Sequence, residues 1–176
     1  MKNLPKLVLT DIDGVWTDGG MYYDNLNNEF KKFNVKDGAG VIFLKQLNIP
    51  VGIITGEKTE IVQRRANKLK VDYLYMGVKN KVEIVKNLSA SLNISVTDMA
   101  YIGDDINDIN LLKIVGFSAT TNDAPNYMKE NVDYVTKCNG GEGAFREFIE
   151  KIISNQGMMP GVLEKYLNEN IKSPKY

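Results

Sequence analysis

Short apolar runs that end in polar residues alternate with helical periods along this chain, and no other feature limits the fold as strongly. The expected strands are residues 7–10, 50–54, 73–75, 99–102, 117–119 and 134–135. The expected helices between them are residues 40–47, 59–69, 81–92, 108–115 and 143–153. Such alternation predicts an α/β fold with a doubly wound, mostly parallel sheet and helices on both faces.

Residues 19–34 interrupt this alternation. Two runs that contain Tyr and Phe flank a turn rich in Asn and Asp, a pattern that predicts a β-hairpin projecting from the sheet. We therefore divide the chain into a core domain at residues 1–156, which includes the hairpin, and a tail at residues 157–176. Within the tail, residues 157–160 resemble a linker, and residues 162–171 predict a short amphipathic helix that docks on the core or on a neighbouring subunit.

Composition excludes several classes of protein. The 22 basic and 22 acidic residues balance, so a nucleic-acid platform is not expected. The chain has no histidine, which excludes a Ser-His-Asp triad and a two-histidine zinc site within it. No apolar run approaches the roughly 20 residues needed to span a bilayer, and no secretory signal is expected. The one cysteine, Cys138, cannot form a disulfide within the chain, which indicates a reducing cytoplasm.

Acidic residues gather where the expected strands end. Asp11 and Asp13 follow the first strand, Thr55 follows the second, and Asp104 follows the strand at residues 99–102. Because ligands of open α/β sheets bind at the carboxyl ends of the strands, these side chains should converge. Clustered carboxylates repel one another in a cleft of low dielectric, and a hard divalent cation with oxygen ligands resolves that repulsion. The pattern therefore predicts a Mg²⁺ site.

Four segments, in this order, resemble the motifs of the haloacid dehalogenase-like phosphatases. They are Asp11-Ile12-Asp13-Gly14-Val15, Thr55-Gly56, Lys81 and Gly103-Asp104-Asp105-Ile106-Asn107-Asp108. The resemblance covers about residues 7–153. A receiver domain of two-component signalling also carries an aspartyl phosphate on a doubly wound sheet, but its phosphorylated aspartate ends a strand in mid-chain, where this chain has Thr55. A catalytically dead scaffold would lack a motif, and here every motif is present.

The resemblance implies a magnesium-dependent phosphatase with defined roles for these residues. Asp11 is the nucleophile that becomes an aspartyl phosphate. Asp13 protonates the leaving alcohol and then activates water. Thr55, Gly56 and Lys81 hold the phosphoryl oxygens, although a lysine two residues before Lys81 competes for that role.

The metal ligands follow from the same resemblance. Asp11 and Asp104 hold the Mg²⁺ with their carboxylates, and Asp13 adds its backbone carbonyl. Asp108 supports these ligands from behind. Asp105 is open between two roles, part of the site or a helix cap.

The spacing of the motifs leaves no room for a cap domain. Thr55 and Lys81 lie only 26 positions apart, and only the hairpin and one helix fit between Asp13 and Thr55. The chain is similar to the capless branch that hydrolyses phosphates of 2-keto-3-deoxy sugar acids, through Asp13-Gly14-Val15, Phe33-Asn34-Val35-Lys36-Asp37-Gly38 and Gly140-Gly141-Glu142-Gly143. This branch implies a homotetramer in which four hairpins form a central barrel and a neighbouring subunit completes each active site.

The sequence is compatible with two different substrates. The octulosonate 8-phosphate phosphatases of lipopolysaccharide synthesis usually have Thr-Gly-Arg where this chain has Thr55-Gly56-Glu57. The segment around Glu57 resembles instead the phosphatases of 2-keto-3-deoxynonulosonate (deaminoneuraminate) 9-phosphate, a sialic-acid precursor. On this interpretation Glu57, together with Lys68 of the partner subunit, selects the substrate. Otherwise Glu57 is an acid at a helix N-terminus. We expect the nonulosonate, with the octulosonate as the alternative.

Overall fold

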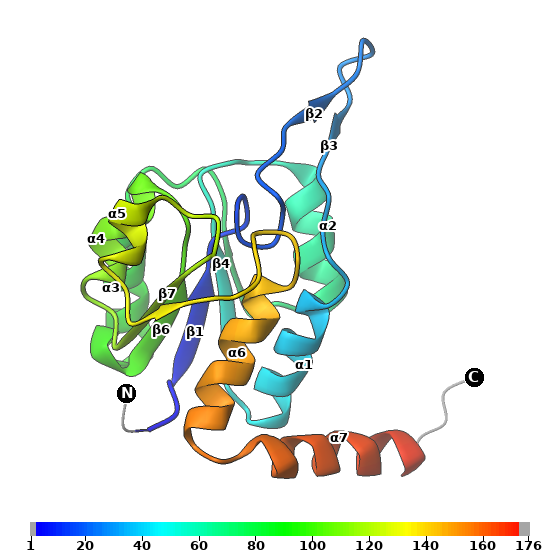
Figure 1. The fold of residues 1–176 in the computed structure, drawn as a ribbon, viewed down its shortest axis with the longest axis vertical. Coiled ribbons are helices and arrows are strands. Elements are labelled where there is room, and N and C mark those ends of the chain that lie inside the picture. Colours follow the sequence, from blue (N-terminus) through cyan, green and yellow to red (C-terminus); the bar gives the residue numbers. More distant parts are fainter. Residues whose placement is uncertain (1–2, 173–176) are drawn as a thin grey trace.

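Six parallel strands form the central sheet of the protein, which is described for residues 3–172 by a computed structural model (Figure 1). The strand order is β5-β4-β1-β6-β7-β8. The strands are β1 Leu7–Thr10, β4 Val51–Ile54, β5 Tyr73–Tyr75, β6 Met99–Ile102, β7 Phe117–Thr120 and β8 Tyr134–Val135. Counted along the chain, this is the doubly wound order 3-2-1-4-5-6, whereas receiver domains have the order 2-1-3-4-5. The predicted fold class is confirmed, and the receiver alternative is wrong.

Helices cover both faces of the sheet, in two layers that Figure 1 shows on either side of β1. One layer consists of α1 Asp37–Gln46, α2 Glu60–Leu69 and α6 Ala144–Asn155. The other consists of α3 Lys81–Leu92, α4 Ile109–Leu112 and α5 Asn126–Lys129. Alternate residues of β1 pack against the two helical layers: Val8 packs against the first layer, and Leu7 and Leu9 pack against the second. The sheet is therefore buried on both faces, as parallel sheets require.

A buried tryptophan fixes the loop that follows β1. Trp16 is fully buried, and its ring centroid lies 4.7 Å from that of Phe145 in α6. Its indole N–H donates a hydrogen bond of 3.0 Å to the hydroxyl of Thr10, so the polar end of the ring is satisfied. The loop after β1 is therefore held between its own strand and α6.

Two glycines let a second loop pack directly on this one. A Cβ on Gly140 would lie 2.1 Å from the carbonyl oxygen of Gly14, and a Cβ on Gly141 would lie 2.6 Å from the amide nitrogen of Asp18. The Gly141 N–H donates to the carbonyl of Val15 at 3.1 Å. The backbones of the two loops are in direct contact at Gly140 and Gly141, and a residue with a Cβ would not fit at either position.

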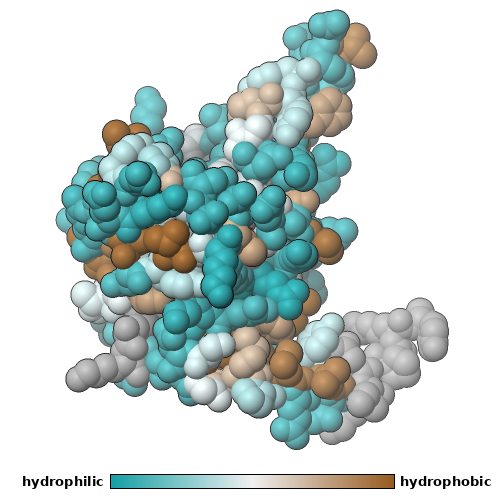
Figure 2. Space-filling view, in the orientation of Figure 1, coloured by the Kyte–Doolittle hydropathy of each residue, from teal (hydrophilic) through white to brown (hydrophobic). Residues whose placement is uncertain are grey.

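The predicted hairpin is present and projects from the body of the molecule (Figure 1). Its paired strands, β2 Tyr22–Tyr23 and β3 Glu29–Phe30, are shorter than the runs that predicted them. The Asp24 carboxylate holds the turn by accepting hydrogen bonds from the amides of Leu26 and Asn28. Several large apolar or aromatic side chains of this projection are exposed: Met21, Tyr22, Tyr23, Leu26 and Phe30. Figure 2 shows hydrophobic surface at the tip of the projection, beside hydrophilic surface.

The tail continues as a helix, α7 Met159–Lys172, which lies at the end of the molecule away from the hairpin (Figure 1). The prediction of a linker at residues 157–160 is wrong for its second half, because Met159 and Pro160 form the first turn of α7. Proline is tolerated there since the first turn needs no backbone donor. Val162 is buried against the core, and Lys165 donates to the carbonyl of Gln46 at 2.6 Å.

Two other helix predictions need correction, and one helix was missed. The helix predicted at residues 40–47 begins at Asp37. The helix predicted at residues 108–115 is a 3₁₀ turn, Ile106–Asp108, followed by the short α4. Helix α5 was not predicted, because four residues are too few to show a helical period. Within residues 3–172, no helix combines the length and the apolar character needed to cross a bilayer.

The packing of the two loops predicts the effect of a single methyl group. Gly140→Ala should lower the free energy of unfolding by about 1–3 kcal/mol, because the new Cβ meets backbone that cannot move aside. Gly161→Ala is the matched control, since a Cβ there meets no atom within 4 Å and alanine favours the helix. Urea unfolding of both variants measures the difference, and equal stabilities would contradict the tight contact of the loops.

Candidate active site

The carboxyl ends of β1, β4 and β6 open into one cavity of about 260 Å³. Asp11 directly follows β1, Thr55 directly follows β4, and Asp104 lies two residues beyond β6. The residues that line the cavity are Asp11, Asp13, Gly14, Gly19, Thr55, Gly56, Glu57, Asp104, Asp105 and Asn107. The topology therefore brings together the polar residues that the sequence places at strand ends, and it adds Gly14, Gly19 and Asn107.

Lys81 lies beneath this cavity and is only 2% exposed. The Asn80 side chain caps α3 by accepting from the Glu83 amide, so the helix begins at Lys81. The Lys81 ammonium donates to Asp11 Oδ2 at 2.5 Å and to Asp108 Oδ1 at 2.6 Å. The competing lysine, at position 79, is exposed and lines a different concavity.

A buried tyrosine completes this network. The hydroxyl of Tyr101, in β6, donates to Asp108 Oδ1 and lies 3.2 Å from the Lys81 ammonium. Sequence reasoning missed Tyr101, although a signal was available. A phenol in a strand that is otherwise apolar must bring its hydroxyl to a partner, because an unpaired buried hydroxyl is costly.

Both oxygens of Asp108 are occupied. Oδ1 accepts from Lys81 and Tyr101, and Oδ2 accepts from the amides of Asp104 at 3.0 Å and Asp105 at 3.3 Å. The carboxylate of Asp105 accepts from the amide of the next residue and caps the 3₁₀ turn. Asp105 thus serves as a cap and also lines the cavity.

The electrostatics of the cavity are dominated by negative charge. Burial raises the pKa of Asp104 to about 8, and Asp11 and Asp108 contribute to the rise. Burial and the Asp108 charge raise the pKa of Asp11 to about 7, although Lys81 opposes them. Burial alone would lower the pKa of Lys81, but the charges of Asp11 and Asp108 outweigh it and leave that pKa raised. The positive charge of Lys81 therefore does not balance the negative charges of Asp11, Asp104 and Asp108.

The donor set fits a hard divalent cation. Carboxylate oxygens of Asp11, Asp104 and Asp108 lie within 4.8 Å of one another. Asp104 Oδ1 is buried, and no hydrogen-bond partner for it occurs in the described part of the chain. Three carboxylates with one ammonium leave two negative charges, which Mg²⁺ could neutralise with oxygen ligands alone. The Asp13 carboxylate is not in this cluster, so Asp13 could join it through the backbone carbonyl.

Asp13 has a cationic partner from the hairpin. The Lys31 ammonium lies 2.7 Å from Asp13 Oδ1 and 3.5 Å from a carboxylate oxygen of Glu29. The Thr17 hydroxyl donates to the same Asp13 oxygen at 3.2 Å. An isolated bridge between Thr17 and Phe33 ties the base of the hairpin to the loop after β1. Sequence reasoning missed Lys31, because no spacing rule predicts that a hairpin side chain pairs with an acidic residue of the cavity.

Known proteins are similar to this chain over most of its length. Residues 76–148 match the haloacid dehalogenase-like hydrolase family. A Yersinia pestis protein named 3-deoxy-D-manno-octulosonate 8-phosphate phosphatase is 38% identical over 156 residues, which cover 89% of this chain and 83% of that protein. The chain belongs to the haloacid dehalogenase-like hydrolases. It is a phosphatase of the capless branch, and the predicted family and enzyme class are confirmed.

Solved structures of phosphatases in this family share the fold. The 3-deoxy-D-manno-octulosonate 8-phosphate phosphatase of Moraxella catarrhalis, in complex with magnesium ion, phosphate ion and KDO, has a TM-score of 0.88 and 33% identity, covering 92% of this chain and 93% of that chain. The cobalt-bound deoxy-D-mannose-octulosonate 8-phosphate phosphatase of Haemophilus influenzae has a TM-score of 0.83 and 36% identity, covering 89% and 91%. Both relatives hold a divalent metal, in agreement with the acidic cluster of this phosphatase.

Glu57 and Lys68 lie far apart in this phosphatase. Glu57 lines the cavity from the loop after β4. Helix α2 begins only at Glu60, with Thr59 as its N-cap, so the interpretation of Glu57 as a helix-start acid is wrong. Lys68 is exposed in the last turn of α2 and is not among the residues that line the cavity. Glu57 therefore lies before α2 and Lys68 lies within it, so the two residues do not share one helix.

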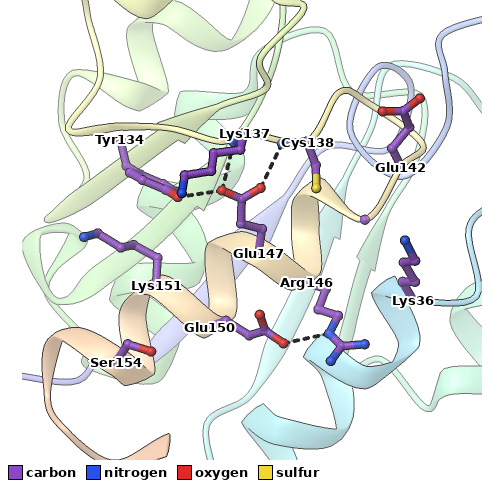
Figure 3. Close-up of a pocket in the computed structure, with 11 residues that line it drawn as sticks. Lys36, Tyr134, Lys137, Cys138, Glu142, Arg146, Glu147, Glu150, Lys151 and Ser154 are labelled. Carbon is purple, nitrogen blue, oxygen red and sulfur yellow. Dashed lines mark hydrogen bonds and ion pairs between the residues drawn. The ribbon is translucent and has the colours of Figure 1, made fainter.

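A larger concavity of about 560 Å³ lies beside α6 (Figure 3). Two of its acidic side chains already have partners, because Glu147 accepts from the Tyr134 hydroxyl and from the amides of Lys137 and Cys138, and Glu150 pairs with Arg146. This surface lacks the converging carboxylates of the strand ends. The smaller cavity is therefore the candidate active site.

The raised pKa values predict that the free energy of unfolding of the metal-free protein depends on pH. The pKa of Asp104 is about 8 in the folded chain and near 3.8 when unfolded, so the metal-free protein should lose stability as the pH rises from about 4 to 8. In EDTA, Asp104→Asn should therefore raise the free energy of unfolding at pH 8 by on the order of 2 kcal/mol, with little change at pH 4. Urea unfolding at both pH values measures this. A variant destabilised at pH 8 would contradict the account of the charges.

Proposed function

We propose that this phosphatase hydrolyses the terminal phosphomonoester of a 2-keto-3-deoxy sugar acid, with 3-deoxy-D-manno-octulosonate 8-phosphate as its substrate and Mg²⁺ as its cofactor. The observation that carries the proposal is the cavity lined by Asp11, Asp13 and Asp104, in a chain that aligns along most of its length with phosphatases of that sugar. The expectation of a nonulosonate thus becomes the second candidate.

The first step is attack by Asp11. Its Oδ2 contacts the Lys81 ammonium, and its Oδ1 accepts from the amide of Ile12 at 2.7 Å, so both oxygens are oriented. An Asp11 oxygen forms a bond to phosphorus while the bond from phosphorus to the sugar oxygen breaks. Asp13, in its protonated form, gives its proton to that leaving oxygen, and the sugar departs as a neutral alcohol.

The second step releases phosphate. The Asp13 carboxylate takes a proton from a water molecule, whose oxygen attacks the phosphorus of the aspartyl phosphate. The bond between phosphorus and the Asp11 oxygen breaks, which regenerates the carboxylate and frees inorganic phosphate. Asp13 is protonated again and ready for the next substrate. Every proton in the cycle therefore passes through one side chain.

The remaining residues hold the phosphoryl group and the metal. The Thr55 hydroxyl, the Gly56 amide and the Lys81 ammonium would bind the phosphoryl oxygens as charge develops on them. Asp11, Asp104 and the backbone carbonyl of Asp13 would hold Mg²⁺. The ion would neutralise charge between the nucleophile and the phosphoryl group. The hydrogen bonds of Asp108 to Lys81 and to the Asp104 amide would keep these groups in position, with Asp105 capping the turn below them.

The nonulosonate 9-phosphate is the second candidate because Glu57 lines the cavity. An arginine at this place would attract the carboxylate of a sugar acid, whereas a glutamate repels it and favours hydroxyl donors. At ~6 Å and an effective dielectric near 20, each unit of charge is worth roughly 2–3 kcal/mol before screening. The charge of residue 57 is therefore large enough to change how a sugar acid binds in the cavity.

The proposal extends to assembly and domain organisation. We propose a homotetramer joined through the hairpin, because Tyr23, Leu26 and Phe30 expose apolar surface that a partner would cover. Lys68 of the partner subunit would then contact the substrate carboxylate. In this proposal residues 1–156 form the catalytic core, residues 157–176 form a tail docked on it, and the enzyme acts in the cytoplasm, as the lone cysteine suggests.

A kinetic panel tests the substrate. We expect kcat/KM for octulosonate 8-phosphate to exceed that for nonulosonate 9-phosphate by about tenfold or more, a difference of roughly 1.4 kcal/mol in transition-state binding. EDTA should abolish both activities, and Mg²⁺ should restore them. Glu57→Arg should widen the preference, whereas Glu60→Arg, which makes the same charge change outside the cavity, should not. A native preference for the nonulosonate that Glu57→Arg reverses would establish the second candidate.

A further inference from the structure

Lys31 brings a positive charge from the hairpin to Asp13, a residue that lines the catalytic cavity. It follows β3 directly, in a hairpin that otherwise projects away from the sheet. Its side chain is fully covered, and its ammonium pairs with Asp13 and Glu29. The next residue, Lys32, differs from Lys31 in burial and in partner. Its side chain is 65% exposed, and its ammonium lies 3.5 Å from Oδ2 of Asp18. Lys31 is therefore built into the site, and Lys32 belongs to the surface.

The two oxygens of Asp13 have different surroundings. Oδ1 is held by the Lys31 ammonium at 2.7 Å and by the Thr17 hydroxyl at 3.2 Å. Oδ2 is buried, and no hydrogen-bond partner for it is found among residues 3–172. A buried oxygen without a partner is costly in a resting protein and is expected where a ligand atom supplies the missing contact.

We propose that Lys31 is a positioning residue for proton transfer by Asp13: it holds Oδ1 so that Oδ2 faces the oxygen of the leaving group. This inference rests on the proposed acid–base role of Asp13. An acid must lie within hydrogen-bond reach of the oxygen that it protonates, and a carboxyl group fixed at one oxygen presents the other in a defined direction. The hairpin thus contributes to catalysis in its own subunit, apart from any role in assembly.

The loss of Lys31 should therefore depend on the leaving group. A sugar alkoxide is strongly basic and needs a proton as it departs, whereas p-nitrophenolate is a weak base and departs without one. For both substrates kcat/KM reports the steps up to cleavage of the ester bond, before water attacks the phosphorus of the aspartyl phosphate. A residue that only stabilises the hairpin would affect both substrates alike, and a positioning residue would affect the sugar phosphate alone.

The experiment compares Lys31→Met with Lys32→Met on octulosonate 8-phosphate and p-nitrophenyl phosphate, at saturating Mg²⁺. General acid catalysis contributes typically 10²–10⁴-fold, so Lys31→Met should lower kcat/KM at least about thirtyfold on the sugar phosphate and less than about threefold on the aryl ester. The retained aryl activity shows that the variant is folded. Lys32→Met should stay within about twofold on both substrates, and Lys31→Arg should recover most of the loss. Equal losses on both substrates, or no loss on either, would overturn the proposal.

Asp13→Asn separates this inference from the proposed function. It should show the same selective loss on the sugar phosphate, and a larger one, because the amide has no proton to give. If Asp13→Asn is selective and Lys31→Met is not, the acid role stands and the positioning role of Lys31 is wrong. If Asp13→Asn lowers kcat/KM equally on both substrates, the acid role of Asp13 is wrong and the inference about Lys31 is overturned with it.

Discussion

The Lys81 ammonium is the charge on which the acidic site depends. It lies buried between Asp11 and Asp108, at 2.5 and 2.6 Å, in a position that the first turn of α3 fixes. Burying carboxylates without a counter-charge is costly, and removing one member of such a network usually leaves an uncompensated charge. Lys81 relieves only part of the repulsion, because Asp104 still has a raised pKa, and its Oδ1 has no hydrogen-bond partner among the residues that the structure describes. The structure thus keeps a site that a divalent cation can complete.

The rest of the fold makes this arrangement rigid. Parallel strands end at one edge, so the side chains of Asp11 and Asp104 are placed by elements buried on both faces. The loop after β1 is held by Trp16 against α6 and by the backbone contact of Gly140 with Gly14. Catalysis by positioned charges requires such support, since groups that can move apart lose most of their effect.

Features that depend on local sequence pattern could be predicted from the sequence alone. Strand positions and the convergence at their ends follow from apolar runs and from the topology of parallel sheets, so most of the cavity lining was predictable from spacing. Tyr101 and Lys31 escaped prediction because their roles depend on contacts across the sheet and on the direction of the hairpin. Helix α2 was predicted to begin at residue 59 and begins at Glu60, and Glu57, which was interpreted as an acid at the N-terminus of a helix, lies in the loop before it. The substrate could not be ranked from residue 57 alone, and the match to relatives along most of the chain changed the order of the two candidates.

The central claim is that Asp11 carries the phosphoryl group between the two steps. The enzyme with Mg²⁺ and excess sugar-acid phosphate is quenched within milliseconds and treated with borohydride, which reduces an acyl phosphate to an alcohol. Mass spectrometry of the digested protein should then find homoserine at position 11, and Asp11→Asn should show none. Homoserine at Asp13 or Asp104 instead, or phosphate release with no modified residue under rapid quench, would contradict the mechanism.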